Sequence, residues 1–149
     1  MALRNITKDG NETLRKKCRM VDVFDSKLAK LLDDMKETMR QADGVGLAGP
    51  QVGILRRVAV IEIDDFYVEL VNPIIVATDG EQIGSEACLS VPNKSCIVKR
   101  PYKVTVQYQD RNGDYYTLEG EELLARACCH EIDHLDGILF YDKEYKEAQ

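Results

Sequence analysis

The spacing of apolar residues in the first third of the chain predicts an amphipathic helix. Its apolar positions recur every three or four residues, as they do on one face of a helix, and they are Leu28, Leu31, Leu32, Met35 and Met39. Asp25 is a good N-cap residue and Gly44 a good stop, so we predict a helix between them that packs its apolar stripe into the core. Before it, residues 1–24 are polar and predict a packed arm in which Asn11 caps a short helical turn that runs to Lys17.

A second stripe of the same period lies near the C-terminus. Leu123, Leu124, Ala127, Cys128 and Leu135 predict a helix from about residue 121 to residue 136, and Gly137 is placed to end it. Acidic residues precede this stripe, where they suit the positive end of the helix dipole.

Between the two helices, short β-branched runs separated by turn residues predict strands. We expect them at residues 58–63, 67–71, 74–78, 97–99, 104–108 and 115–118, with a break at Asn72-Pro73 and a hairpin turn at residues 110–113. A short closing strand is expected at residues 138–141, and the last eight residues are expected to fray. The order predicts an α+β fold in which antiparallel β-sheets pack around the C-terminal helix, with the N-terminal helix outside, as one domain over residues 1–149.

Composition narrows the class of protein. The chain of 149 residues is 44% hydrophobic and 31% charged, with a net charge of −6, so it is of ordinary globular type and offers no basic surface for nucleic acid or anionic membrane. No apolar run approaches the roughly 20 residues needed to span a bilayer, and residues 1–10 do not resemble a signal peptide. We therefore expect a cytoplasmic protein with no membrane or direct nucleic-acid partner.

The five cysteines do not form a disulfide framework. Their number is odd, two of them are adjacent at Cys128-Cys129, and no C-x-x-C pair occurs. We expect reduced thiols, as is usual in the cytosol.

The predicted C-terminal helix carries the only two histidines of the chain, in the sequence His130-Glu131-Ile132-Asp133-His134. Residues four apart on an α-helix lie about 40° apart around its axis, so both imidazoles project from one face and can bind one metal ion. Glu131 follows the first histidine and can act as general base toward the attacking water. The H-E-x-x-H pattern thus predicts a metal-dependent hydrolase.

Two histidines do not complete a catalytic metal site, which usually has three protein ligands. Only residues 135–149 follow His134, too few to build another ligand-bearing element behind the site, so the third ligand is expected upstream. Cys88 is the best candidate, with Glu86 two residues before it as an orienting carboxylate. A buried cysteine is more often a small hydrophobe than a ligand, so the residues alone leave the third ligand open.

Three segments resemble the motifs of peptide deformylases, in that family's order and at similar separations. They are Gly44-Val45-Gly46-Leu47-Ala48-Gly49-Pro50-Gln51, Glu86-Ala87-Cys88-Leu89-Ser90 and Cys129-His130-Glu131-Ile132-Asp133-His134-Leu135. The resemblance, which covers nearly the whole chain, implies removal of the formyl group from formyl-methionyl peptides or nascent chains.

The resemblance also implies the roles of individual residues. Cys88, His130 and His134 would bind one divalent metal ion, which is iron(II) in many members, although the ligands also suit zinc, nickel or cobalt. Glu131 would be the general acid and base, and the Gln51 side chain and the Leu89 backbone N–H would bind the formyl oxygen. The substrate-binding residues would be Val45, Gly46, Glu86, Ala87 and Ala127, with Val45, Glu86 and Ala127 lining the methionine pocket.

The chain departs from the family's usual residues at three motif positions. Alanine is usual where Gly49 stands, glycine where Ala87 stands and glutamine where Cys129 stands, and an arginine common near Ser95 is absent. These changes allow a second interpretation, a divergent metal-binding paralogue with low or altered amide hydrolase activity. Another metal-dependent amidase or peptidase fits the third motif alone. The C-terminal helix of some members is not expected here, so association with the ribosome is left open.

Overall fold

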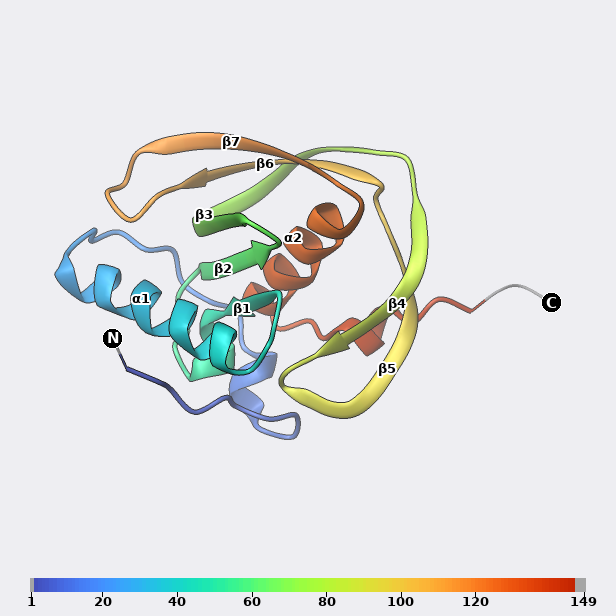
Figure 1. Ribbon diagram of the computed structural model, residues 1–149, viewed down its shortest axis with the longest axis horizontal. Helices are drawn as coiled ribbons and strands as arrows, with labels where there is room; N and C mark the ends of the chain where they lie inside the picture. Colours follow the sequence, from blue (N-terminus) through green and yellow to red (C-terminus); the bar gives the residue numbers. More distant parts are fainter. Residues whose placement is uncertain (1, 147–149) are drawn as a thin grey trace.

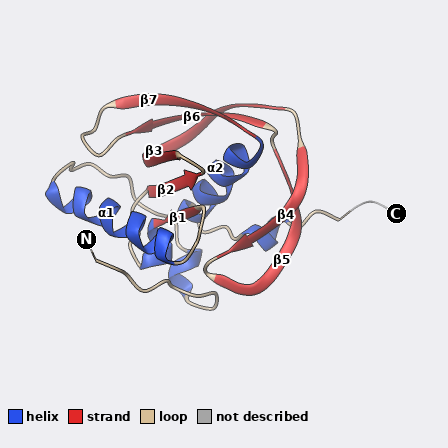
Figure 2. Ribbon diagram, in the orientation of Figure 1, coloured by secondary structure: helices blue, strands red, loops and turns tan. Residues whose placement is uncertain are grey.

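The computed structural model describes residues 2–146 and consists of two sheets and two α-helices, with short 3₁₀ turns (Figures 1 and 2). Its strands are β1 (Gly46–Ala48), β2 (Val58–Ile63), β3 (Phe66–Asp79), β4 (Gln82–Cys88), β5 (Val91–Arg100), β6 (Lys103–Gln109) and β7 (Tyr115–Glu121). All pairings of these strands are antiparallel: β1, β2, β3, β6 and β7 form one sheet in that order, and β4 and β5 form a second. The predicted α+β class is confirmed.

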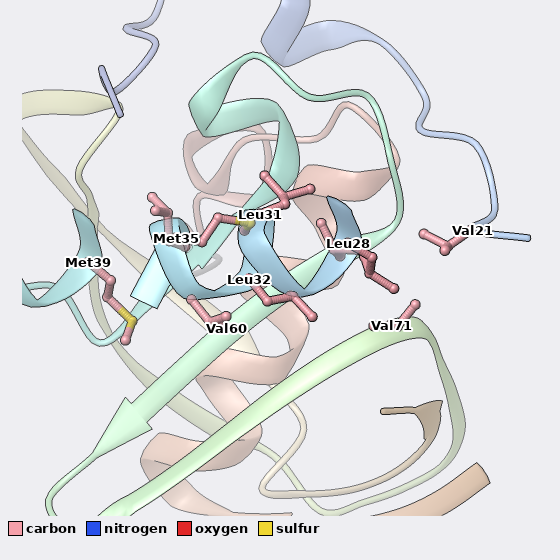
Figure 3. Packing of buried hydrophobic residues seen from close by; sticks show 10 residues of the cluster. Val21, Leu28, Leu31, Leu32, Met35, Met39, Val60 and Val71 are labelled. Atoms are coloured by element: carbon pink, nitrogen blue, oxygen red, sulfur yellow. The ribbon is translucent and has the colours of Figure 1, made fainter. Parts of the chain in front are cut away.

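The two helices cover opposite faces of the five-stranded sheet. Helix α1 (Ser26–Gln41) packs its apolar stripe against one face, which includes Val58 and Val60 of β2 (Figure 3). Helix α2 (Glu122–Leu135) packs against the other face, which includes Ile61. Successive residues of a strand point to opposite faces, so β2 is apolar on both sides and reads as a continuous apolar run.

The second sheet lies across α2 from the five-stranded sheet (Figure 1). Strand β5 and the 3₁₀ turn η3 (Phe140–Lys143) enclose a small apolar cluster around Phe140 and Val98. Helix α2 is therefore the central element of the fold, as predicted, and both sheets contact it. No helix within residues 2–146 is long and apolar enough to cross a membrane.

The predicted helix boundaries are largely confirmed. The Asp25 side chain accepts a hydrogen bond from Leu28 N at 3.1 Å and caps α1, and Asn11 caps the 3₁₀ turn η1 (Glu12–Arg15) in the same way. The predicted stop at Gly44 is wrong. Helix α1 ends at Gln41, and the residue that takes the left-handed conformation is Asp43, with φ of 56°. Aspartate is one of the few side chains that tolerate this conformation.

Two predictions about the strands are also wrong, and the expected fraying of the C-terminus is contradicted within residues 142–146. Strand β3 continues through Asn72-Pro73. Asn72 adopts φ of 52°, and a register shift between Val71 and Ile74 means that Pro73, which has no N–H, is not paired with a residue of β6. The expected strand at residues 138–141 is instead η3, which begins where Asp142 accepts a hydrogen bond from Leu139 N. Of the last eight residues, Tyr145 donates its N–H to Ile97 O, and residues 147–149 lie outside the described part.

Helix α2 ends in a Schellman motif, as predicted from Gly137. Gly137 N donates to His134 O at 3.2 Å, Ile138 N donates to Asp133 O at 3.0 Å, and Gly137 has φ of 76°. The glycine also lies close to the N-terminal arm, because a Cβ built on it would be 2.5 Å from the backbone oxygen of Arg15. Only glycine satisfies both the conformation and the contact.

We therefore expect Gly137→Ala to destabilise the protein more than Gly53→Ala. Gly53 has nearly the same φ, 80°, but a Cβ there meets nothing within 4 Å. Its substitution should cost about 1 kcal/mol for the left-handed conformation alone, and Gly137→Ala should cost more because a backbone atom must move. The free energy of unfolding from urea titrations tests this, and equal losses in the two variants would contradict the steric argument.

Candidate active site and metal centre

The two histidines lie on one face of α2, as their spacing predicts. Both are buried, and their ring centroids are 5.0 Å apart with the ring planes inclined at 68°. The helix is held in place by Cys128 and Ile132, which pack into the apolar core shared with the five-stranded sheet. Two imidazoles are thus fixed at a separation that one ion can bridge.

Cys88 reaches the histidines from the second sheet. It ends β4 at a register shift, where Ala87 pairs with Ser95 but Cys88 pairs with Val91. Its Sγ lies 3.3 Å from His134 Nε2, and one ligand atom from each of Cys88, His130 and His134 lies within 4.8 Å of the other two. These residues are the one such group of three within residues 2–146. The set of one thiolate and two imidazoles is typical of catalytic metal sites.

The electrostatics of the cluster fit a cation. Burial lowers the pKa of His134 to about 3, so its imidazole is neutral and its lone pair is available. Burial also disfavours a charged His130, but interactions with Glu131, Cys88 and Glu86 raise its pKa to about 10. Surroundings that attract a proton so strongly attract a metal ion in its place. His134 Nδ1 is also buried without a hydrogen-bond partner.

Glu86 orients His130. Its Oε1 lies 2.9 Å from His130 Nδ1, and because a carboxylate only accepts, we assign the imidazole proton to Nδ1, which leaves Nε2 to coordinate. Arg100 binds both oxygens of the same carboxylate, at 2.8 and 2.9 Å, and Arg126 Nη1 donates to Oε2 at 2.6 Å. Burial would raise the pKa of Glu86, but these donors hold it well below its usual range. Arg100 also donates to Asp133 at 2.7 Å.

Glu131 occupies space that Gly46 leaves free. A Cβ built on Gly46 would lie 2.3 Å from Glu131 Oε2, so any larger residue at position 46 would displace this carboxylate. Glu131 Oε1 is buried without a hydrogen-bond partner. Burial raises the pKa of Glu131 to about 7, which is the range in which a carboxylate both accepts and returns a proton near neutral pH.

Gln51 and Leu89 flank the ligand cluster. Gln51 is held by Ala48 N, which donates to its Oε1 at 3.0 Å, while its Nε2 lies 3.1 Å from Ser90 Oγ and 3.5 Å from Cys88 Sγ. Leu89 lies against Gly44, where a Cβ would be 2.6 Å from Leu89 Cδ1. The amide N–H groups of Gln51 therefore lie beside the cysteine sulfur.

These groups open onto a cavity of about 400 Å³, the size of a small-ligand site. Of the predicted site residues, His134 alone does not line it; those that do are Val45, Gly46, Gln51, Glu86, Ala87, Cys88, Leu89, Ala127, His130 and Glu131. The sequence reasoning missed Arg100 and Arg126. Arg126 lies four residues before His130, on the same helix face, and this spacing would have revealed it. No local signal marks Arg100.

The three motif departures fit their surroundings differently. At Gly49, a Cβ would lie 2.6 Å from Ile54 O and 2.7 Å from Arg56 O, so the loop after η2 (Gly49–Val52) approaches too closely for the usual alanine. Cys129 is buried among apolar side chains, which raises the pKa of its thiol to about 11 and keeps it neutral. Ala87 is exposed on the outer face of β4.

Comparisons with known proteins agree on one family. The model of the family described as polypeptide deformylase matches residues 3–149. A peptide deformylase of Acetivibrio thermocellus is 58% identical over 143 residues, which cover 96% of this chain and 84% of the relative. Among crystal structures, a peptide deformylase from Legionella pneumophila matches with a TM-score of 0.94 and 44% identity, over 97% of this chain and 87% of the other. A peptide deformylase from Thermotoga maritima matches with a TM-score of 0.96 and 37% identity, over 98% of this chain and 100% of the other.

We expect Cys88→Ala and His134→Ala each to lose most of the divalent metal that the unchanged protein binds at about one ion per chain. Each substitution removes one of the three ligand atoms that converge in the site. Cys18→Ala is the matched control, because Cys18 is also a buried free thiol but packs beside Leu135, away from the cluster. Elemental analysis of the purified proteins measures occupancy, and full retention in both ligand variants would disprove the assignment.

Proposed function

The chain belongs to the polypeptide deformylase family, and from this membership we propose that Cys88, His130 and His134 together bind one divalent metal ion beside Glu131. The family consists of metal-dependent hydrolases that remove N-formyl groups from nascent peptides, and this is the activity of the chain. The observation that supports the site assignment best is the convergence of three ligand atoms within 4.8 Å next to a buried carboxylate. When bound, the ion supplies a Lewis acid that polarises the formyl group and favours ionisation of water.

Two donors are placed to bind the formyl oxygen. We assign this role to Gln51 Nε2, which lies 3.5 Å from Cys88 Sγ, and to the backbone N–H of Leu89, the residue after Cys88. Gln51 is fixed before substrate arrives by its hydrogen bonds to Ala48 and Ser90. A preorganised donor to a developing oxyanion is typically worth about 3 to 4 kcal/mol.

Glu131 carries the proton. It accepts one from the attacking water and delivers it to the leaving amine, so that the products are formate and a free N-terminus. The tight fit of Glu131 against Gly46 holds the carboxylate at the cavity wall.

The remaining cavity residues bind the peptide. We propose that the backbone at Gly46 and Ala87 holds the substrate chain, while Val45, Glu86 and Ala127 line the pocket for the methionine side chain. Formyl is the smallest acyl group, so a narrow site selects it by excluding larger ones.

Three further assignments complete the proposal. We propose iron(II) as the native ion, as in many members of the family that the motifs resemble. Zinc, nickel and cobalt are substitutes, because thiolate and imidazole ligands suit all four. The family match over residues 3–149 supports one deformylase-like domain. Nascent chains as substrates support the cytoplasmic location. Ribosome association is not assigned.

Turnover of an N-formyl-methionyl peptide by protein purified without oxygen and loaded with iron or nickel tests the function. Release of formate at a rate proportional to metal content supports it. Full metal content without turnover would instead favour the metal-binding paralogue considered from the motif departures.

Glu131→Gln should lower turnover of the formyl-methionyl peptide by about 10²- to 10⁴-fold, because it keeps the shape of the side chain and removes the proton acceptor. Metal content should be unchanged, since all three ligands remain. Glu121→Gln, at an exposed position just before α2, serves as control and should change neither quantity. Near-normal turnover in metal-loaded Glu131→Gln protein would remove Glu131 from the mechanism.

The iron form should lose activity in air and the nickel form should persist far longer. Cys88 is partly exposed, whereas the other four cysteines are buried. Iron(II) bound beside it is accessible to oxygen, and the cysteine itself can also be oxidised. Activity is followed over time in air and under nitrogen for both forms. Equal decay of the two forms in air would show that inactivation does not depend on iron.

A further inference from the structure

The methionine pocket has a guanidinium in its wall. On β4, Gly84, Glu86 and Cys88 share the face that points toward α2, because side chains alternate along a strand. Gly84 leaves room on that face, and Arg126 fills it: a Cβ built on Gly84 would lie 3.1 Å from Arg126 Nη2 and 3.6 Å from Cζ. Arg126 lines the same cavity as Ala127 and Leu123.

Part of this guanidinium is not used by the protein. Nη1 is saturated, because it donates to Glu86 Oε2 at 2.6 Å and to Val98 O at 3.1 Å. Nη2 has one distant partner among the described residues, Gln82 Oε1 at 3.5 Å, and Nε has none. Nε is not among the buried side-chain atoms that lack a partner, so it remains accessible although the side chain is only 9% exposed, and Nη2 keeps a second N–H without a partner among the described residues. A pocket that is also lined by Leu123 and Ala127 therefore offers N–H donors on a guanidinium that Glu86 holds in place.

We propose that these donors let the enzyme accept N-formyl-methionine sulfoxide, so that it also deformylates nascent chains whose first residue has been oxidised. This inference rests on the proposed function. The thioether of methionine accepts hydrogen bonds weakly, whereas its sulfoxide is polar. A pocket without donors would reject the sulfoxide, because a polar group that loses water without gaining a hydrogen bond is costly to bury. The guanidinium replaces the lost water.

The reaction itself is unchanged by this substitution. Water still cleaves the formyl amide, formate leaves, and the sulfoxide takes no part, so no oxidant or reductant is needed. Arg126 is therefore a specificity-determining residue, and its effect should appear as a ratio between two substrates.

The test compares kcat/KM for three peptides that differ only in the first residue: formyl-methionine, formyl-methionine sulfoxide with each epimer assayed separately, and formyl-norleucine. In the unchanged protein, the better sulfoxide epimer should fall within about tenfold of methionine. In Arg126→Leu, this ratio should fall by a further 10- to 100-fold, the usual effect of losing a hydrogen bond from a charged donor. The ratio of norleucine to methionine should stay the same.

A loss of activity that affects all substrates equally cancels in the ratio of two kcat/KM values for the same protein. This matters because Arg126 also supports Glu86, so its substitution can lower activity on every substrate. Leu123→Ala, on the apolar part of the same cavity, is the matched control and should leave the sulfoxide ratio unchanged. Arg126→Met, which keeps the apolar stem, must repeat the loss seen in Arg126→Leu. Equal sulfoxide ratios in the unchanged and Arg126 proteins, or rejection of both epimers by more than 100-fold in the unchanged protein, would overturn the inference. Failure to turn over formyl-methionine would instead overturn the proposed function.

Discussion

The carboxylate of Glu86 is the point on which the site depends. It joins three elements, because it accepts hydrogen bonds from Arg100 of β5 and from Arg126 and His130 of α2 while itself belonging to β4. The second sheet shares no strand with the larger one, so this cluster fixes its position on α2, and apolar contacts with Phe140 join it to η3. Breaking a buried ion pair by removing one partner typically costs about 3 to 5 kcal/mol, since the other charges stay buried. Cys88, two residues from Glu86, is positioned with it.

The sequence predicts local features of this structure well. Both α-helices follow from the period of their apolar residues, and the caps at Asp25 and Gly137 follow from the backbone conformations that these residues favour. The pairing of the two histidines also follows from spacing within one helix, which needs no knowledge of the fold. Structural features that depend only on residues close in the sequence can therefore be predicted from it.

Features that depend on register or on distant neighbours could not be predicted in the same way. The continuity of β3 through Asn72 depends on its pairing with β6, in which β3 has one extra residue between Val71 and Ile74, and η3 depends on a cap that Asp142 supplies. Arg100 meets Glu86 only because β4 and β5 pair in one register, in which Glu86 lies opposite Cys96. Glu131 fits into its position because Gly46 has no side chain there. The sequence does not indicate this role of Gly46, because it depends on which residues lie next to the glycine in the fold.

The ionic character of the Glu86 cluster has a thermal consequence. The cost of keeping charged groups out of water falls as temperature rises, whereas stabilisation by apolar burial levels off. The contribution of the cluster that joins β4 and β5 to α2 to the stability of the protein therefore increases on heating, relative to the contribution of the apolar core. Because Glu86 is two residues from Cys88 and bonds directly to His130, the geometry of the ligand cluster is held by the part of the structure least weakened by heat, and it should endure until the molecule unfolds as a whole.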